Sequence, residues 1–493
     1  MNRSVRRLAF VLLLAFAALL ANLSYVQMAR SHALSENPAN RRLLVKEYAI
    51  QRGQIIAGDQ TLAESIATTD NLKYVRRYPL KGLFGFITGY YSVVYGRSAL
   101  ESSFNDYLSG KRPFTFDTNL ADELLGRDRK GNSLVLTIDP ALQRIAAEKL
   151  GDQRGAVAAI NPDTGAVLAL YSYPTYDPNP LSTHDRSSMR EAWERLNKNS
   201  SRPLIPRATQ ERYPPGSTFK PIIAAAALEA GLKPSTRFPN PSSGFHLPDT
   251  TRTLKNFGGG ACRGGATISL ADGLRVSCNS TFAQTALKIG AAAVIGMAEK
   301  FGLDRDLGFD VPLVQSCVVA NPSGGCAQPV LDKPQTALTG IGQFGVRVTP
   351  LEMAIVAATV ANGGRVPRPM LVKEVQDFNG AILKTFKPSL SRPIFSRETA
   401  STLKQMMINV VKTGTGTNAQ IPGVEVGGKT GTAQTGVESE FPHTWFIAFA
   451  PHIAVAVIVE HGGDLGNEAT GGKVSAPIAR ALIEYWVRHG GAK

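Results

Sequence analysis

Cysteine and histidine are scarce in this chain. Its 493 residues include 4 cysteines and 7 histidines, and none of them stands in a CxxC or HExxH arrangement. Zinc sites need such closely spaced ligands, and small disulfide-scaffolded proteins need many more cysteines, so the sequence argues against both classes. We therefore expect neither a metal nor another cofactor.

Charge is also sparse and unbalanced. Charged residues make up 19% of the chain, below the roughly 25% of an average domain, and hydrophobic residues make up 43%, which excludes disorder of the whole chain. The length allows about two to four domains. Lys and Arg number 54 against 39 Asp and Glu, a formal net charge of +15. This excess favours anionic surroundings such as a lipid surface, a wall polymer or nucleic acid, without choosing among them.

The chain has one long apolar run, at its N-terminus. After a basic start, Leu8–Leu23 is apolar except for Asn22, and a helix continued to Met28 is about 32 Å long, enough to cross a bilayer. A cleaved signal peptide starts in the same way, and Ser31–Ala33 offers small residues at a cleavage spacing. Arg30 and several polar residues separate that site from the run, so we expect an uncleaved anchor over residues 1–30.

The hydrophobic pattern of the rest of the chain changes near residue 155. Residues 31–154 mix short alternating stretches with glycine breaks and offer no obvious catalytic group. They end in a predicted strand, Ser133–Ile138, and a predicted helix, Pro140–Leu150. No glycine-, serine- or proline-rich linker longer than a few residues and no internal repeat interrupts the chain.

Residues 155–493 begin and end with predicted strands and are helical between them. The predicted strands are Ala156–Ile160, Ala166–Tyr171, Val424–Lys429, Thr444–Phe449 and Ile453–Glu460. The predicted helices are Thr218–Ala230, Ser280–Ile289, Ala292–Phe301, Pro350–Ala361, Arg397–Val411 and Ser475–Arg488. This order predicts an α+β domain whose sheet is assembled from both ends of the segment and covered by helices.

Three short patterns stand in order along this domain. They are Ser217-Thr218-Phe219-Lys220, Ser277-Cys278-Asn279 and Lys429-Thr430-Gly431-Thr432. Each pattern alone is weak, because S-x-x-K, S-x-N and K-T-G recur elsewhere by chance. The recurrences are Ser401–Lys404, Ser35–Asn37, Ser103–Asn105 and Lys412–Gly414.

The context of Ser217 distinguishes it from the chance matches. Two prolines and a glycine precede it and an apolar helical run follows Lys220, so Ser217 is predicted at a helix N-terminus with Lys220 one turn on. Pro221 is compatible only with the first turn of such a helix. Ser401, in contrast, lies inside a helical pattern. The simpler interpretation of Ser217 and Lys220 alone is a helix cap and a solvated lysine.

The three patterns together predict acyl transfer through a serine. A serine hydroxyl needs a base to become a nucleophile, and Lys220 can serve only if burial and a second cation, Lys429, lower its pKa. Ser277 can pass a proton between the lysine and the leaving amine, and Asn279 can hold both the lysine and a substrate amide.

The third pattern supplies the binding groups. We expect Lys429 to open a turn at the end of an apolar strand, where Gly431 permits close backbone approach. The hydroxyls of Thr430 and Thr432 can then bind a carboxylate. The backbone N–H groups of Thr432 and Ser217 together can form an oxyanion hole.

These patterns are signatures of penicillin-binding proteins and class A β-lactamases, and the chain resembles the class B penicillin-binding proteins. Further similarities run along most of its length. They are Arg52-Gly53-Gln54-Ile55, Tyr213-Pro214-Pro215-Gly216-Ser217, Gly340-Ile341-Gly342-Gln343, Gly427-Gly428-Lys429-Thr430-Gly431-Thr432-Ala433-Gln434 and Trp445-Phe446-Ile447-Ala448-Phe449. The short N-terminal region and the overall length most resemble the actinobacterial penicillin-binding protein A group. Cys278 stands where β-lactamases commonly carry Asp, at a position that varies in the resembling family.

The resemblance implies an architecture and an activity. The architecture is an anchor over residues 1–30, a pedestal or dimerisation-type domain over 31–154, and a penicillin-binding/β-lactamase-like transpeptidase domain over 155–493. The activity is that of a membrane-bound peptidoglycan D,D-transpeptidase, with its N-terminus cytoplasmic and its catalytic domain outside, inhibited by β-lactam antibiotics. The implied partners are stem peptides, the membrane, glycan-polymerising enzymes and division or elongation proteins, and not nucleic acid.

Other functions with the same serine remain to be weighed. A class A β-lactamase needs a glutamate on a loop after S-x-N, whereas the similar Glu194–Asn197 segment lies before Ser217. A membrane-bound β-lactam sensor needs a signalling domain before the anchor, and a purely structural partner needs no intact set of motifs. A D,D-carboxypeptidase, which transfers the same acyl group to water, remains an alternative.

The four cysteines allow three pairings. An even count in an exported domain favours two local disulfides, Cys262 with Cys278 and Cys317 with Cys326, as the simplest connectivity. The first would tie the segment bearing Ser277 and Asn279 to the loop before it. The alternative is four free thiols, with Cys278 as a small buried residue.

Overall fold

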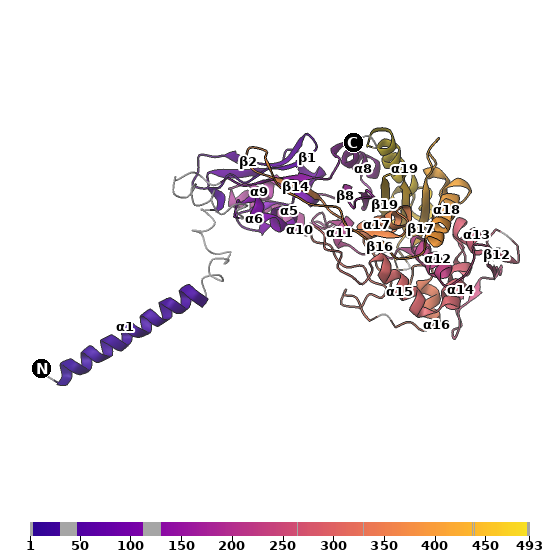
Figure 1. Ribbon diagram of the computed structural model, residues 1–493, viewed down its shortest axis with the longest axis horizontal. Coiled ribbons are helices and arrows are strands. Elements are labelled where there is room, and N and C mark those ends of the chain that lie inside the picture. Colours follow the sequence, from indigo (N-terminus) through magenta and orange to yellow (C-terminus); the bar gives the residue numbers. More distant parts are fainter. Residues whose placement is uncertain are drawn as a thin grey trace.

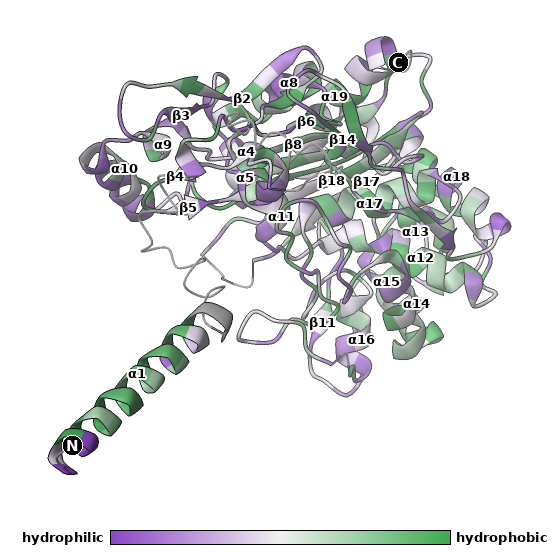
Figure 2. Ribbon diagram, turned by 60° about the vertical axis from the view of Figure 1, so that its left-hand side comes forward, coloured by the Kyte–Doolittle hydropathy of each residue, from purple (hydrophilic) through white to green (hydrophobic). Residues whose placement is uncertain are grey.

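The computed structural model describes residues 3–29, 47–111 and 130–490, apart from positions 264, 329, 436 and 438. The cleavage spacing at Ser31–Ala33, Arg30, the chance match at Ser35–Asn37 and part of the glycine-rich loop before Ser277 lie outside the described residues. Helix α1 (Arg3–Ala29) stands apart from the folded body (Figure 1). Most of its ribbon has the green of hydrophobic residues (Figure 2), and the segment Arg3–Val26 is long and apolar enough to cross a membrane. Helix α1 is therefore the candidate membrane anchor.

A mixed sheet forms the core of the N-terminal part of the body. Its six strands have the order β15-β14-β6-β1-β2-β3. The strands are β1 (Ile55–Ala57), β2 (Gln60–Ala67), β3 (Tyr74–Arg77), β6 (Ser133–Leu136), β14 (Val372–Gln376) and β15 (Ile382–Thr385). The hairpin β14–β15 comes from the later half of the chain and pairs with β6 in antiparallel register. In Figure 1, β14 is an orange strand among indigo and purple ones.

Short elements surround this sheet, and one of them, α5, carries the glutamate of a buried ion cluster. They are η1 (Lys81–Leu83), α4 (Gly85–Thr88), β4 (Tyr91–Ser92), β5 (Gly96–Arg97), α5 (Ala99–Ser103) and α6 (Asn105–Leu108). Glu101 is fully buried, and its two carboxylate oxygens accept hydrogen bonds from Arg52 Nε (2.5 Å) and Arg76 Nε (2.6 Å). Burial opposes the charge of Glu101, but the two arginines hold its pKa below the usual value. Arg52 thus fixes the entry of the chain into the sheet.

The central sheet of the later part is antiparallel, with the order β17-β18-β19-β7-β8. Its strands are β7 (Gly155–Ile160), β8 (Val167–Tyr173), β17 (Gly427–Ala433), β18 (His443–Ala450) and β19 (Ile453–Val459). The prediction of one sheet built from both ends is therefore confirmed. The expected strand Val424–Lys429 is wrong in its bounds, because β17 starts at Gly427 and places Lys429 inside the strand instead of at a turn.

Helices cover both faces of this sheet. Helix α17 packs against β19 and β7 on one face, and α19 and α8 pack against the other. Helices of eight or more residues here are α8 (Pro140–Leu150), α10 (Arg186–Lys198), α12 (Lys220–Glu229), α14 (Asn279–Ile289), α15 (Ala291–Phe301), α17 (Pro350–Ala361), α18 (Arg397–Thr413) and α19 (Ser475–Tyr485). The segment η4 (Glu460–Glu468) consists of 3-10 turns separated by a kink. Coverage on both faces explains why β7, β18 and β19 read as continuous apolar runs.

Shorter elements connect these helices and strands. They are α9 (Asn179–Ser182), α11 (Arg207–Gln210), η2 (Gly216–Phe219), β9 (Arg237–Pro239), β10 (Phe245–His246), β11 (Thr253–Leu254), β12 (Thr267–Ser269), α13 (Leu270–Arg275), α16 (Lys333–Thr339), β13 (Arg365–Pro367), β16 (Leu390–Pro393), η3 (Thr417–Ala419) and η5 (Trp486–Gly490). The expected closing helix to Arg488 ends as an α-helix at Tyr485 and continues as one π-helical turn.

A buried glutamate lies in the first turn of α17, whose N-cap is Thr349. Glu352 is 3% exposed, and its carboxylate accepts hydrogen bonds from Thr349 Oγ1 (2.7 Å), Ser316 N (3.2 Å) and Ser316 Oγ. Burial outweighs these bonds and raises its pKa to about 7. Because the folded state holds this proton more tightly than the unfolded state, Glu352 stabilises the fold fully below its unfolded pKa. This contribution to the free energy of unfolding is lost as the pH rises through about 7.

We expect Glu352→Gln to remove this pH dependence, because glutamine keeps the hydrogen bonds without a charge. Relative to the variant, the free energy of unfolding of the wild type should fall by about 3 kcal/mol between pH 5 and pH 8. Urea unfolding at several pH values measures this difference. Glu148→Gln, on the exposed face of α8, is the matched control. Parallel pH profiles for the wild type and Glu352→Gln would contradict the assignment.

Candidate active site

Ser217 lies in the short 3-10 turn η2, directly before α12 begins at Lys220. Two glycines make this turn possible. Gly216 has φ +52° and its N–H donates to Gly342 O at 3.0 Å, and a Cβ on Gly342 would lie 2.0 Å from Gly216 O. The Gly340–Gln343 pattern is thereby packed against the residue before the nucleophile. Ser217 itself remains partly exposed.

Lys220 is fully buried beside the second pattern. Its Nζ donates to Ser277 O (2.7 Å) and Asn279 Oδ1 (2.9 Å), and lies 3.5 Å from Ser277 Oγ. Burial, and next the charge of Lys429, lower the pKa of Lys220 well below its usual value. A neutral amine near pH 7 is the form that can accept a proton from a serine hydroxyl.

Ser277 links the two lysines. Its hydroxyl oxygen accepts a hydrogen bond from Lys429 Nζ at 2.7 Å, in addition to its contact with Lys220. Ser277 has φ +61°, a left-handed conformation that costs a non-glycine residue free energy. Asn279 is the first residue of α14 and also donates from Nδ2 to Lys255 O at 3.0 Å, so its amide is fixed from both sides.

Lys429 is fully buried in β17, where its Nζ also donates to Thr430 O at 2.9 Å. Burial lowers its pKa to about 7. The expected turn at this lysine is absent from the strand, and its side chain reaches Ser277 from the sheet instead. Gly431 allows this edge strand to approach η2, because a Cβ there would lie 2.9 Å from Thr218 Cγ2 and 3.1 Å from Pro215 O.

The two threonines of the third pattern have different surroundings. Thr432 is partly exposed beside η2, and an added Cβ on Gly216 would be 3.1 Å from Thr432 O. Thr430 is buried, and its hydroxyl is 2.6 Å from the hydroxyl of Thr415. Thr415 was not predicted from the sequence. The signal that could have found it is the run of small residues that follows α18.

A second group missed by the sequence analysis supports the segment before Ser217. Glu460 Oε1 accepts hydrogen bonds from Tyr213 OH (2.8 Å) and Arg207 Nε (2.7 Å), and Trp445 Nε1 donates to Pro214 O at 3.0 Å. Burial opposes the charge of Glu460, but the arginine and the tyrosine hydroxyl help hold the pKa of this buried carboxyl below its usual value. These contacts fix both ends of the Tyr213–Pro214 pair.

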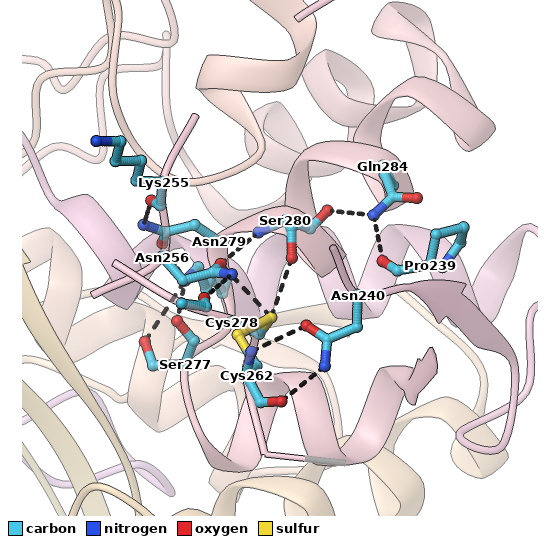
Figure 3. Close-up of a disulfide and its surroundings, with 12 residues drawn as sticks. Pro239, Asn240, Lys255, Asn256, Cys262, Ser277, Cys278, Asn279, Ser280 and Gln284 are labelled. Atoms are coloured by element: carbon cyan, nitrogen blue, oxygen red, sulfur yellow. Dashed lines mark hydrogen bonds between the residues drawn. A yellow bond between two sulfur atoms is a disulfide. The ribbon is translucent and has the colours of Figure 1, made fainter. Parts of the chain in front are cut away.

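A disulfide borders the second pattern (Figure 3). Cys278, which precedes Asn279, is bonded to Cys262. The Cys262 loop is held in turn by Asn240, whose Nδ2 donates to Cys262 O at 2.6 Å and whose Oδ1 accepts from Cys262 N at 2.9 Å. Asn256 Oδ1 accepts from Ser280 N at 2.9 Å. The loop and the start of α14 therefore form one connected unit around Ser277 and Asn279.

We expect Cys262→Ser to slow acylation more than it changes the fold. The bridge closes a loop of sequence separation 16, so its loss costs about 3 kcal/mol at most, while freeing the strained Ser277 turn should slow acylation by roughly tenfold or more. Penicillin acylation kinetics and urea unfolding measure the two effects. Cys326→Ser, which opens the Cys317–Cys326 bridge, is the control and should not slow acylation. An unchanged rate in Cys262→Ser would contradict the prediction.

The cysteines are not available as metal ligands. Among the described residues, Asp304, Cys317 and Cys326 bring three potential ligand atoms together, but both sulfur atoms are in the second disulfide. The three sequence patterns contribute lysine, serine, asparagine and threonine side chains, and none of the imidazole, thiolate or carboxylate groups that commonly bind metals. The chemistry of the site is that of amines and hydroxyls.

Comparison with known proteins identifies the class. Residues 155–484 match the model of the penicillin binding protein transpeptidase domain, and residues 52–134 match that of the penicillin binding protein A dimerisation domain. The chain belongs to the penicillin-binding protein transpeptidase family. The resemblance and the α+β transpeptidase fold predicted from the sequence are thus confirmed.

Particular relatives are similar over the full length. The peptidoglycan D,D-transpeptidase PbpA of Mycolicibacterium smegmatis is 40% identical over 99% of this chain and 100% of its own length, and that of Mycobacterium tuberculosis H37Rv is 39% identical over 98% and 99%. The structure of penicillin-binding protein A from M. tuberculosis as a ceftriaxone acyl-enzyme complex has a TM-score of 0.83 at 40% identity, covering 90% of this chain and 99% of that chain. Its penicillin G acyl-enzyme complex has a TM-score of 0.81 at 39% identity, covering 89% and 100%.

Proposed function

We infer that this protein is a peptidoglycan D,D-transpeptidase that works through an acyl-serine intermediate and is inhibited by β-lactams. The observation that supports this most directly is the chain of contacts from Lys220 through Ser277 to Lys429 beside Ser217. Relatives similar over their full length are named as D,D-transpeptidases. Two structures of penicillin-binding protein A from M. tuberculosis are β-lactam acyl-enzyme complexes.

Acylation follows from the geometry of the lysines. Lys220 takes the proton of the Ser217 hydroxyl, and the oxygen attacks the carbonyl carbon of the penultimate D-Ala of a stem peptide. The backbone N–H groups of Ser217 and Thr432 stabilise the resulting oxyanion. The C–N bond then breaks, and the proton returns through Ser277 to the amine of the leaving D-Ala. Thr432, Thr430 and Lys429 bind the terminal carboxylate.

Deacylation uses the same groups in reverse. An amine of a neighbouring stem peptide loses a proton to Lys220, attacks the ester carbonyl and releases Ser217, which leaves a peptide cross-link. A β-lactam acylates Ser217 in the first step, but its ring-opened product keeps the amine attached and blocks the acceptor. Glu194 cannot serve a β-lactamase-like deacylation, because it lies on the exposed face of α10 and pairs with Lys198 at 3.0 Å.

We also propose where the protein lies in the cell and which kinds of protein bind it. Helix α1 anchors the chain, with the N-terminus cytoplasmic and the catalytic domain outside, where stem peptides are found. The N-terminal part, which we place at residues 31–154, serves as a pedestal on which glycan-polymerising and division or elongation proteins dock. Among its described residues, 47–111 and 130–154, none forms a side-chain hydrogen bond with Ser217, Lys220, Ser277, Asn279 or Lys429.

Incubation of the full-length protein in detergent with a D-Ala-D-Ala stem peptide and an acceptor amine tests this function. Mass spectrometry should find release of D-Ala and a cross-linked dimer. Penicillin should prevent both and add its mass to the tryptic peptide that contains Ser217. Hydrolysed tetrapeptide alone, at any acceptor concentration, would favour a D,D-carboxypeptidase. Rapid release of hydrolysed penicillin would favour a β-lactamase.

A further inference from the structure

Two arginines that interact electrostatically lie on neighbouring segments that lead to Ser217. Arg212 directly precedes Tyr213, and Arg347 directly precedes Val348. Tyr213 and Val348 pair as an antiparallel bridge with both N–H···O distances at 2.9 Å. Their neighbouring segments meet again where Gly216 N donates to Gly342 O at 3.0 Å. The arginines therefore occupy the same packed unit as the nucleophile.

Backbone carbonyls hold each guanidinium in a fixed orientation. Arg212 Nη1 donates to Gln315 O at 3.2 Å and contacts Cys317 Sγ at 2.9 Å. Arg347 Nη1 donates to Val346 O at 2.9 Å and Phe344 O at 3.3 Å. The disulfide-bridged loop joins both, because Cys317 and Arg347 exchange two backbone hydrogen bonds. Within the described part of the chain, the Nε and Nη2 groups of both arginines make no hydrogen bond.

No carboxylate of the described residues forms an ion pair with either arginine. The buried arginines elsewhere are neutralised: Arg52 and Arg76 pair with Glu101, and Arg207 pairs with Glu460. Glu211, next to Arg212, is paired instead with Arg202 at 3.3 Å. Burial, and next the charge of Arg212, lower the pKa of Arg347. Two fixed guanidinium groups thus repel each other in a partly buried position without an internal counter-charge.

An exposed aromatic side chain adjoins the pair. Phe344 is 42% exposed and has φ +67°, which is strained for a bulky residue. Its carbonyl oxygen is the one that Arg347 holds at 3.3 Å. The exposed ring of Phe344 therefore lies close in the chain to Arg347, just after the turn that begins with Gly342.

We propose that Arg212 and Arg347 form a carboxylate-binding subsite for the stem peptide, separate from the site of its terminal carboxylate. The inference rests on the proposed function and specifies the substrate: a peptide with a second, internal carboxylate. The planar guanidinium forks match a carboxylate in bidentate geometry, and binding it relieves the repulsion between the two cations.

Two synthetic pentapeptides ending in D-Ala-D-Ala test the subsite on the full-length protein. They differ only at an upstream glutamyl residue, which carries a free α-carboxylate in one and a carboxamide in the other. For the wild type we expect a KM for D-Ala release that is roughly tenfold lower for the free acid. Arg212→Gln and, separately, Arg347→Lys should reduce this ratio toward one, while penicillin acylation of Ser217 stays unchanged.

Arg202→Gln is the matched control, since Arg202 is an exposed arginine near Arg212 and should keep the full ratio. Equal KM values in the wild type, or a ratio retained in Arg212→Gln, would overturn the subsite. Inorganic phosphate that inhibits wild type and Arg212→Gln to different extents, without discrimination between the peptides, would assign the pair to a phosphate polymer instead. A wild type that penicillin does not acylate contradicts the proposed function itself.

Discussion

Replacing Ser217 with alanine is expected to abolish covalent labelling by penicillin and cross-linking of stem peptides. Ser217 is partly exposed and one turn before the buried Lys220, in the turn η2 that packs against the strand of Lys429. Without its hydroxyl no ester can form, so the acylation rate should fall by at least roughly four orders of magnitude. Intact-mass measurement after incubation with penicillin should show no adduct.

The fold should survive this substitution, because only one exposed hydroxyl is removed from η2. The urea midpoint of Ser217→Ala should match that of the wild type. Ser401→Ala is the matched control: Ser401 belongs to the chance S-x-x-K match and lies on the exposed face of α18. A penicillin adduct that persists in Ser217→Ala, or disappears in Ser401→Ala, would contradict the proposal that Ser217 is the nucleophile.

The position of Ser217 just before a helix could be predicted from the sequence, because neighbouring residues determine it. The prolines before Ser217 and the alanine-rich run after Lys220 determine where a helix can begin, and α12 begins at Lys220. The sheet built from both ends was readable for a similar reason. Its strands are continuous apolar segments with clear boundaries, apart from the one that carries Lys429.

The strand β17 was misjudged because its composition is unusual for a strand. Glycine and threonine alternate around Lys429, and glycine normally weakens a strand. Tertiary packing reverses this preference: Gly431 lets the strand lie against Pro215 and Thr218, where any side chain would collide. The conformation of Ser277 was unreadable too, because its positive φ depends on contacts with residues far along the chain.

Non-local pairing accounts for what was missed elsewhere. The hairpin β14–β15 lies between two helices of the later part, yet it completes a sheet whose other strands precede residue 137. Short strands of this kind carry no signal of their partner. The carboxyl groups of Glu460 and Glu352 looked like ordinary polar residues, because only the fold shows that one supports Tyr213 and the other is buried.

The second large effect is expected from Lys220 and Lys429, because we assign them different roles in acylation. Lys220 contacts Ser277 and Asn279 and lies one turn from Ser217, so we propose it as the base, with Lys429 acting on it through charge and through Ser277. Arginine keeps the charge but cannot be deprotonated near neutral pH. Lys220→Arg should therefore slow penicillin acylation by roughly a thousandfold, and Lys429→Arg by roughly tenfold.

The pH dependence of acylation separates the two roles further. Acylation needs neutral Lys220, so its rate falls as the pH drops through the lowered pKa of this amine. Because the charge of Lys429 helps to lower that pKa, Lys429→Met should move the acid limb of the rate profile to higher pH, while Lys429→Arg, which stays charged throughout, should not. Stopped-flow acylation rates between pH 5 and pH 10 measure the limb. If Lys429→Met slowed acylation without moving the limb, Lys429 would act by binding the substrate carboxylate alone and not by tuning the base.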